Sequence, residues 1–266
     1  MVKKNVSVED LDLPEGVTDI LIKNGIKELY PPHAEAVFPA LGGNNLMVAI
    51  PTASGKSLIA YLAAVKQVLE NHGKVIYIVP LRALAAEKYE DLKRFERLGL
   101  KVGVSVGDFD SPDPQLDRYD IIVATSEKAD SLLRHRTDWV KTVALVVADE
   151  VHLIHDPGRG PTLEITLAKL KKLNPTIQII ALSATIHNAK DVAEWLDAKL
   201  IESEWRPTRL KEGVYLENKI YFVDNTRHEV RNLKTPVVSL VCDAVENGGQ
   251  CLVFVNTRKA TGTEAK

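Results

Sequence analysis

A glycine, a lysine and a serine end the segment Pro51–Ser57, which reads PTASGKS. The apolar run Leu46–Ile50 precedes this segment, and a helical pattern follows it. At a turn from strand to helix, backbone N–H groups converge on one point and the helix N-terminus adds a partial positive charge. Gly55 would allow close approach of the backbone, Lys56 would meet β- and γ-phosphates, and the Ser57 hydroxyl would bind Mg²⁺. The segment therefore predicts a phosphate-binding loop.

One position departs from the strict phosphate-loop pattern GxxxxGKS/T, because Ile50 stands where the pattern has its first glycine. A chance turn containing Gly-Lys-Ser is the alternative. The strand before the segment and the helix after it favour the phosphate loop. The expected nucleotide-binding residues of this segment are Ile50, Pro51, Thr52, Ala53, Ser54, Gly55, Lys56 and Ser57.

Two adjacent carboxylates, Asp149 and Glu150, follow the apolar run Val143–Ala148. Burying both at a strand end is costly unless a cation accompanies them, and Mg²⁺ is such a cation. Asp149 is then expected to hold the ion through water, while Glu150 orients the attacking water molecule. His152 is expected to face the next loop. A solvated strand end is the alternative, and the phosphate loop earlier in the chain favours the catalytic interpretation.

The elements that must position these residues are short apolar runs, most of them rich in Val and Ile. Such runs are typical of strands buried on both faces of a parallel sheet. Helical patterns separate them, which predicts an α/β fold with helices on both faces of the sheet. The expected strands are Leu46–Ile50, Val75–Val79, Val102–Val106, Ile121–Ala124, Val143–Ala148 and Ile177–Leu182. The expected helices include Ser57–Glu70, Leu81–Arg97 and Leu163–Leu173.

The composition is that of a globular protein, with 45% hydrophobic and 26% charged residues among 266. The net charge of −2 argues against a polybasic nucleic-acid binder, although a local groove can still be basic. No apolar run approaches the ~18 residues that a membrane span requires. No apolar signal core follows the N-terminus. We expect a cytoplasmic protein without a membrane partner.

Six segments, in this order, resemble the motifs of superfamily-two helicases. They are Thr52–Ser57, Pro80–Ala85, Thr125–Asp130, Asp149–His152, Ser183–Thr185 and Val253–Arg258. The stretches DEVH, TSEKADSLLR and RGPTLE are similar to those of the superkiller-type branch, and within it to the archaeal Hjm DNA repair helicases.

This resemblance implies ATP and Mg²⁺ as cofactors, and two RecA-like domains of P-loop type in one parent chain. It implies ATP-driven translocation on single-stranded or forked DNA, with strand separation and 3′–5′ polarity. The implied residues are Lys56, Asp149 and Glu150 for catalysis, Ser57 and Asp149 for Mg²⁺, Arg82, Thr125 and Ser126 for nucleic-acid phosphates, and His152, Ser183 and Thr185 for coupling to movement of the second domain.

Simpler interpretations stay open for several of these residues. Arg82 could be a solvated arginine at a helix end, and Thr125 with Ser126 could be a plain N-cap. An N-cap and a phosphate contact are compatible, because both use a helix N-terminus. Ser183–Thr185 could be an ordinary turn.

His33 departs from the family pattern, because relatives carry a glutamine at this position of Tyr30–His33. We expect His33 to lie in the ATP site. A glutamine amide donates to adenine N7 and accepts from N6-H₂ together, whereas imidazole nitrogens diverge and cannot form that pair. The alternative is a solvent-facing residue at a helix start.

The resemblance also predicts the organisation of the chain. The expected parts are an N-terminal segment 1–30, an ATP-binding RecA-like domain 31–203, a linker 204–235 and the start of a truncated second RecA-like domain 236–266. In the last two parts, Lys219–Val223 and Cys251–Val255 are expected strands and Pro236–Glu246 an expected helix.

The motif V threonine and the motif VI arginines of the family are missing from this sequence. Because an arginine finger is worth ~10³–10⁵ in rate, we expect the 266-residue chain to be weakly active or inactive as an ATPase. An RNA helicase of the same branch and a non-hydrolysing nucleotide-binding module remain alternatives, since phosphate contacts are common to DNA and RNA.

Overall fold

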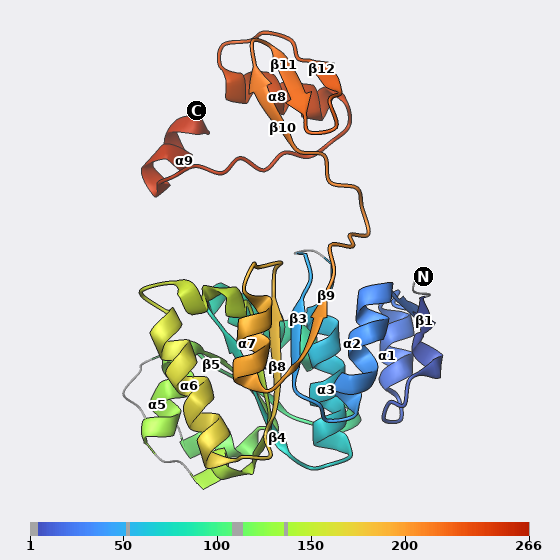
Figure 1. Ribbon diagram of the computed structural model, residues 1–266, viewed down its shortest axis with the longest axis vertical. Coiled ribbons are helices and arrows are strands. Elements are labelled where there is room, and N and C mark those ends of the chain that lie inside the picture. The colour runs from blue at the N-terminus through green and yellow to red at the C-terminus, as the bar shows by residue number, and fades with distance from the viewer. Residues whose placement is uncertain (1–4, 52–53, 108–113, 136–137, 266) are drawn as a thin grey trace. The chain divides into compact units, whose positions relative to one another are not determined.

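The computed structural model describes residues 5–51, 54–107, 114–135 and 138–265 (Figure 1). The chain divides into two compact units, Met1–Pro207 and Thr208–Lys266. Each unit is described by itself below.

The first unit is built on a seven-stranded sheet in which every pairing is parallel. The strand order is β5-β6-β4-β7-β8-β3-β9. The strands are β3 (Leu46–Ala49), β4 (Lys74–Val79), β5 (Val102–Ser105), β6 (Ile121–Thr125), β7 (Val143–Ala148), β8 (Gln178–Ser183) and β9 (Lys199–Glu202). The predicted parallel sheet is confirmed, and β9 is an additional strand that the sequence analysis did not predict.

Helices cover both faces of this sheet, as the α/β prediction requires (Figure 1). Helices α1 (Val17–Lys23), α2 (Pro31–Leu41), α3 (Ser57–Leu69) and α4 (Arg82–Lys93) pack on one face. Helices α5 (Ser126–Arg134), α6 (Gly160–Leu173) and α7 (Ala189–Leu196) pack on the other. Within β4, Tyr77 belongs to the first core while Ile76 and Ile78 belong to the second. Alternate residues of one strand thus fill both cores, which explains why these strands are continuously apolar.

Short elements complete the first unit. A two-stranded antiparallel sheet joins β1 (Val6–Ser7) to β2 (Glu28–Leu29) before α2. Single-turn 3₁₀ helices lie at Val8–Asp10, Glu96–Leu98, Pro114–Arg118, Asp138–Thr142 and Val151–His155. No helix among the described residues is long and apolar enough to span a membrane.

The second unit holds an antiparallel three-stranded sheet with two helices. The elements are β10 (Gly213–Leu216), β11 (Lys219–Phe222), β12 (Arg227–Glu229), α8 (Pro236–Glu246) and α9 (Arg258–Glu264). The sequence predicted β11 and α8 but neither neighbour of β11. The strand predicted at Cys251–Val255 is wrong, because no described strand pairs with this segment. Most of its side chains are exposed, with Leu252 at 78% and Phe254 at 86%, and Val255 is half-buried.

Candidate nucleotide-binding site

The predicted phosphate loop connects β3 to α3 at the carboxyl edge of the sheet. Ile50 N–H donates a hydrogen bond to the Ser183 carbonyl at 3.2 Å, so the loop starts beside the end of β8. The Ser54 hydroxyl donates to the Pro51 carbonyl at 2.6 Å and is buried. Gly55 has a φ of 86°, a left-handed conformation that favours glycine. Thr52 and Ala53, which were also assigned to the loop, lie outside the described residues.

Lys56 and Glu150 form an ion pair at this edge, with Lys56 Nζ 3.1 Å from Glu150 Oε1. Glu150 follows β7 and has a φ of 52°, a left-handed conformation uncommon for a residue with a side chain. Its N–H donates to Asp149 Oδ1 at 2.9 Å. The conformation of Glu150 therefore turns its carboxylate toward the phosphate loop while Asp149 stays buried.

His152 lies on the other side of the same carboxylate. Its Nδ1 is 3.3 Å from Glu150 Oε2. The pair lacks hydrogen-bond geometry, so this nitrogen has no hydrogen-bond partner in the described part of the chain. The structure thus brings His152, Glu150 and Lys56 together, and a coupling role for His152 stays a prediction.

Asp149 is only 3% exposed and is surrounded by groups that sequence analysis did not connect to it. The Tyr77 hydroxyl, on β4, donates to Asp149 Oδ2 at 3.0 Å. Lys88 Nζ, on α4, is 3.8 Å from the same oxygen. Burial raises the pKa of the Asp149 carboxyl, and the nearby charge of Lys88 acts in the opposite direction. Burial first, and the Asp149 charge second, raise the pKa of Tyr77 well above its usual value.

The two oxygen ligands expected for Mg²⁺ are the Ser57 hydroxyl and the Asp149 carboxylate. Lys88 Nζ approaches both, at 3.2 Å from Ser57 Oγ and 3.8 Å from Asp149 Oδ2. No group of three or more His, Cys, Asp or Glu side chains among the described residues could hold a metal alone. Mg²⁺ is usually held by one or two protein oxygens together with substrate phosphates and water. The donors present fit that mode of binding.

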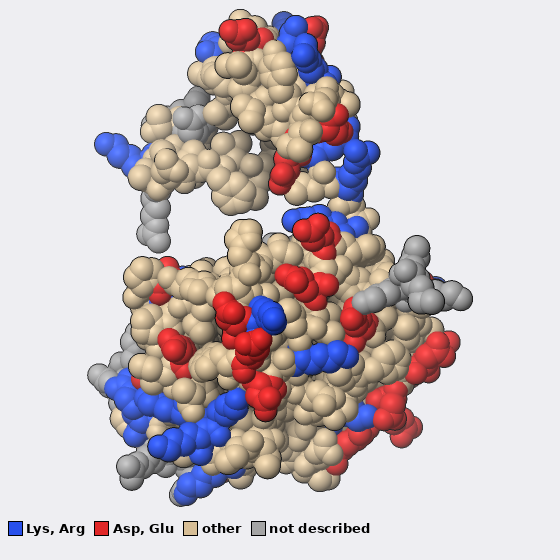
Figure 2. Space-filling model, viewed as in Figure 1, with Lys and Arg blue, Asp and Glu red and all other residues tan. Residues whose placement is uncertain are grey.

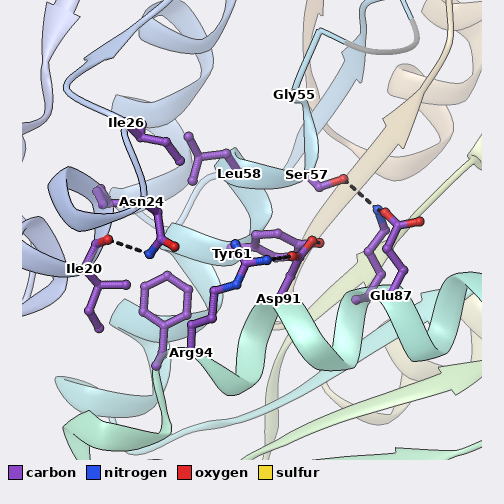
Figure 3. Close-up of a pocket in the computed structure, with 13 residues that line it drawn as sticks. Ile20, Asn24, Ile26, Gly55, Ser57, Leu58, Tyr61, Glu87, Asp91 and Arg94 are labelled. Atoms are coloured by element: carbon purple, nitrogen blue, oxygen red, sulfur yellow. Dashed lines mark hydrogen bonds and ion pairs between the residues drawn. The ribbon is translucent and has the colours of Figure 1, made fainter. Parts of the chain in front are cut away.

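A cavity of about 290 Å³ opens beside Gly55 and Ser57, between α1, α3 and α4 (Figure 3). Ile26 and Leu58 supply part of its apolar lining. Asp91 accepts a hydrogen bond from the Tyr61 hydroxyl at 3.0 Å and pairs with Arg94 at 2.7 Å. The sequence analysis assigned none of the polar residues Asn24, Asp91 and Arg94 that line it.

His33 lies in the first turn of α2, against the phosphate loop. It is 4% exposed, and its Nε2 is buried without a hydrogen-bond partner among the residues described. A Cβ atom added at Gly55 would be 3.2 Å from His33 Cε1. Burial lowers the pKa of the His33 ring, and a hydrogen bond with the Ser54 backbone acts in the opposite direction. The solvent-facing alternative for His33 is therefore wrong, because the ring is buried against the loop.

The residues predicted to contact nucleic acid lie at the ends of two neighbouring strands. Val79 of β4 pairs with Thr125 of β6, so the N-termini of α4 and α5 are adjacent at the carboxyl edge. Arg82 begins α4 and is exposed, whereas Ser126 is buried. The Thr125 side chain accepts from Lys128 N–H at 3.4 Å, so the N-cap interpretation is correct. Contact with phosphates stays a prediction.

The basic side chains on the face shown in Figure 2 do not mark this edge. One group of them lies around the lower end of α6, whose last turn carries Lys171 and Lys172. Cations at a helix C-terminus are stabilised by the helix dipole, which is a sufficient reason for their position.

The two predicted coupling residues at the end of β8 differ in their surroundings. Ser183 is fully buried, and its hydroxyl lacks a hydrogen-bond partner within the described ranges. Thr185, two residues later, is exposed. Ser183 thus lies between the phosphate loop after β3 and Asp149 after β7, since β8 lies between these strands.

The chain is 54% identical over 98% of its length to an ATP-dependent DNA helicase Hel308 of Methanocella arvoryzae, of which it covers 36%. It is 50% identical to Hel308 of Thermococcus kodakarensis and 49% identical to that of Pyrococcus abyssi, covering 23% and 35% of them. The chain thus spans about a quarter to a third of the length of these relatives.

A solved structure, the DUF1998 helicase MrfA bound to DNA, has a similar fold. It matches 77% of this chain with a TM-score of 0.65 and 23% identity, and the match covers 31% of that protein. Residues 30–192 match the DEAD/DEAH box helicase family. The resemblance drawn from the sequence motifs is confirmed, and the chain belongs to the DEAD/DEAH box helicase family.

Proposed function

We propose that these residues form the ATP-binding part of an ATP-dependent DNA helicase that translocates in the 3′–5′ direction and separates strands. The observation that carries this proposal is the pairing of Lys56 Nζ with Glu150 Oε1 at 3.1 Å, beside the buried Asp149. A phosphate-binding lysine and a water-orienting carboxylate thereby meet at one edge of a parallel sheet. Relatives at about half identity over nearly the whole chain, named as DNA helicases, support the DNA substrate.

The ion pair gives each residue a role. A triphosphate bound at the loop would attract Lys56 away from Glu150, because phosphate oxygens carry more negative charge than a single carboxylate. Glu150 would then be free to orient a water molecule toward the γ-phosphate. Mg²⁺, held through Ser57 and Asp149, would neutralise charge that develops on the phosphates. His33, which is buried against the loop at Gly55, would contact the adenine base.

The DNA-facing part of the proposal rests on the adjacent N-termini of α4 and α5. Two neighbouring helix N-termini present N–H groups and partial positive charge, which suit successive phosphates of one strand. Arg82 would add a charge-assisted contact from an exposed position. Ser183, Thr185 and His152 would couple the nucleotide site to a second RecA-like domain. In this scheme residues 31–203 bind ATP, 204–235 connect, and 236–266 begin the second domain.

Nucleotide binding tests the site directly. Titration calorimetry with ATP and Mg²⁺ is expected to detect binding by the wild-type chain and none by Lys56→Ala. Lys172→Ala, an exposed lysine in the last turn of α6, is the matched control and should bind as wild type does. Equal affinity of the Lys56→Ala chain would refute the phosphate loop.

Unwinding tests the substrate. The full-length helicase that carries this chain should separate DNA duplexes with a 3′ single-stranded extension, and not those with a 5′ extension. Paired RNA substrates of the same sequences distinguish the RNA-helicase alternative, which predicts preferential unwinding of the RNA.

A further inference from the structure

Lys88 is a buried lysine that the proposed reaction does not yet use. It lies in α4 and is 7% exposed. Its Nζ donates to Ser57 Oγ at 3.2 Å and lies 3.8 Å from Asp149 Oδ2. These two oxygens are the ones proposed to hold Mg²⁺, so an ammonium group stands where the metal cation is needed. The dashed line at the Ser57 hydroxyl in Figure 3 marks this hydrogen bond.

An ammonium and Mg²⁺ cannot both occupy this position. Both are cations, and their repulsion at a few ångströms is weakly screened in a buried site. Lys88 therefore has to leave the two oxygens before Mg²⁺, with its bound water, can be held there. A lysine can make such a move, because its charge ends a flexible four-carbon chain.

Glu87 provides a place for the displaced ammonium. Its Oε1 already lies 2.8 Å from Lys88 Nζ, and its side chain is 56% exposed. A small rotation of the Lys88 chain toward Glu87 would keep one charge partner and bring the ammonium nearer to solvent. The Lys88 ammonium can thus move between two positions, one at the Ser57 and Asp149 oxygens and one at Glu87 alone.

We propose that Lys88 is a positioning residue, which holds the cation site between Ser57 and Asp149 before nucleotide binds and yields it to Mg²⁺. This inference rests on the proposed ATP and Mg²⁺ site. Its consequence is a competition between the protein's own cation and the metal. Lys88 then raises the Mg²⁺ concentration at which the nucleotide complex forms, and it keeps Asp149 paired at low Mg²⁺.

Mg²⁺ titration of nucleotide binding tests the competition. Binding of a non-hydrolysable ATP analogue is measured at a fixed analogue concentration while Mg²⁺ is varied, by fluorescence or calorimetry. Lys88→Met removes the charge with little change in side-chain length, and should lower the half-saturating Mg²⁺ concentration by about threefold to tenfold. Lys88→Arg retains the charge and should keep a requirement near that of wild type. Lys93→Met, on an exposed lysine of the same helix, is the control and should change nothing.

A second variant keeps the test decisive if Lys88→Met does not fold, which circular dichroism will reveal. Glu87→Gln, on the exposed partner, weakens the alternative position and should raise the Mg²⁺ requirement by about twofold to threefold. An unchanged requirement in the folded variants overturns the proposal. So does a raised requirement with Lys88→Met, which would mean that Lys88 binds the nucleotide. Absence of Mg²⁺-dependent binding in the wild type would instead refute the proposed nucleotide site.

Discussion

Lys56 Nζ lies 3.1 Å from Glu150 Oε1, and the two side chains are 7% and 22% exposed. Each is thus the other's charge partner at the edge of the sheet where β3 and β7 end. A ligand that binds Lys56 must break this pair, so the free energy of nucleotide binding includes the loss of the ion pair.

Glu150→Gln should separate binding from hydrolysis. The amide keeps an oxygen that can accept from Lys56 but loses the charge, so phosphates compete with a weaker partner. We expect ATP affinity at least equal to that of wild type and no detectable phosphate release. Calorimetry and a phosphate-release assay measure the two quantities. Glu194→Gln, an exposed glutamate on α7, should leave both unchanged. Weaker ATP binding by Glu150→Gln would contradict this account of the pair.

The 266-residue chain should hydrolyse ATP very slowly, and single-stranded DNA should stimulate it little. The reason is the missing motif VI arginines, since such arginines are worth ~10³–10⁵ in rate. The measurement is steady-state phosphate release with and without single-stranded DNA. Robust DNA-stimulated turnover, or unwinding by the purified chain, would show that the catalytic site is complete without them.

His33 should make the choice of base dependent on pH. The neutral ring can accept one hydrogen bond from adenine N6-H₂, and one such bond is worth ~0.5–1.5 kcal/mol. ATP should therefore be preferred to GTP by about threefold to tenfold through this contact. Because burial lowers the pKa of His33 from 6.5, the neutral ring persists at pH 6.5 and the preference should shrink only at lower pH.

The matched protein for this measurement is His33→Gln. A glutamine amide can form both in-plane hydrogen bonds, so its ATP preference should be larger and independent of pH from about 8 to about 5. Affinities for ATP and GTP are measured for both proteins across that range. Equal preference in the two proteins at every pH would mean that His33 supports the phosphate loop without contacting the base.

Tyr77→Phe should destabilise the first unit. The change removes a hydroxyl that donates to Asp149 Oδ2 at 3.0 Å in a fully buried position. A hydrogen bond to a charged group contributes about 1.5–3 kcal/mol, so a loss of that order in the free energy of unfolding is expected. Urea unfolding at pH 7 measures it. Tyr215→Phe, whose hydroxyl bonds Asn218 in the second unit, is the control and should leave the unfolding of the first unit unchanged. A loss with Tyr77→Phe no larger than that of the control would contradict a structural role for the Tyr77 hydroxyl.

The sequence predicted the elements whose pattern is local. β7 is apolar at every position because both of its faces are covered, and this pattern is visible without a structure. β9 reads Lys-Leu-Ile-Glu, too short and too polar at its ends to be distinguished from a loop. Cys251–Val255 has the pattern of a buried strand, yet a strand also needs a neighbour whose hydrogen bonds it can share. Composition alone cannot supply that neighbour.

In the site, too, the sequence predicted the residues that stand in local motifs and not those brought in by distant segments. Lys56 and Glu150 stand in recognisable motifs, and their roles could be expected before their contact was known. Tyr77 and Lys88 stand in no such motif of the nucleotide site. They reach Asp149 because β4 pairs with β7 and because α4 packs on the same face as α3. Such contacts depend on the pairing of distant segments, which periodicity does not encode.

The order of the strands also sets the distance between the phosphate loop, which follows β3, and Thr125, which ends β6. From β3 to β6 the sheet passes through β8, β7 and β4, four steps between neighbours. At about 4.8 Å per step, the phosphate loop and Thr125 lie about 19 Å apart along the edge. The hydrogen bonds between neighbouring parallel strands keep this separation constant. We therefore expect a change at the proposed nucleotide site to reach the proposed DNA-contacting end through the side chains that project from the strand ends between them.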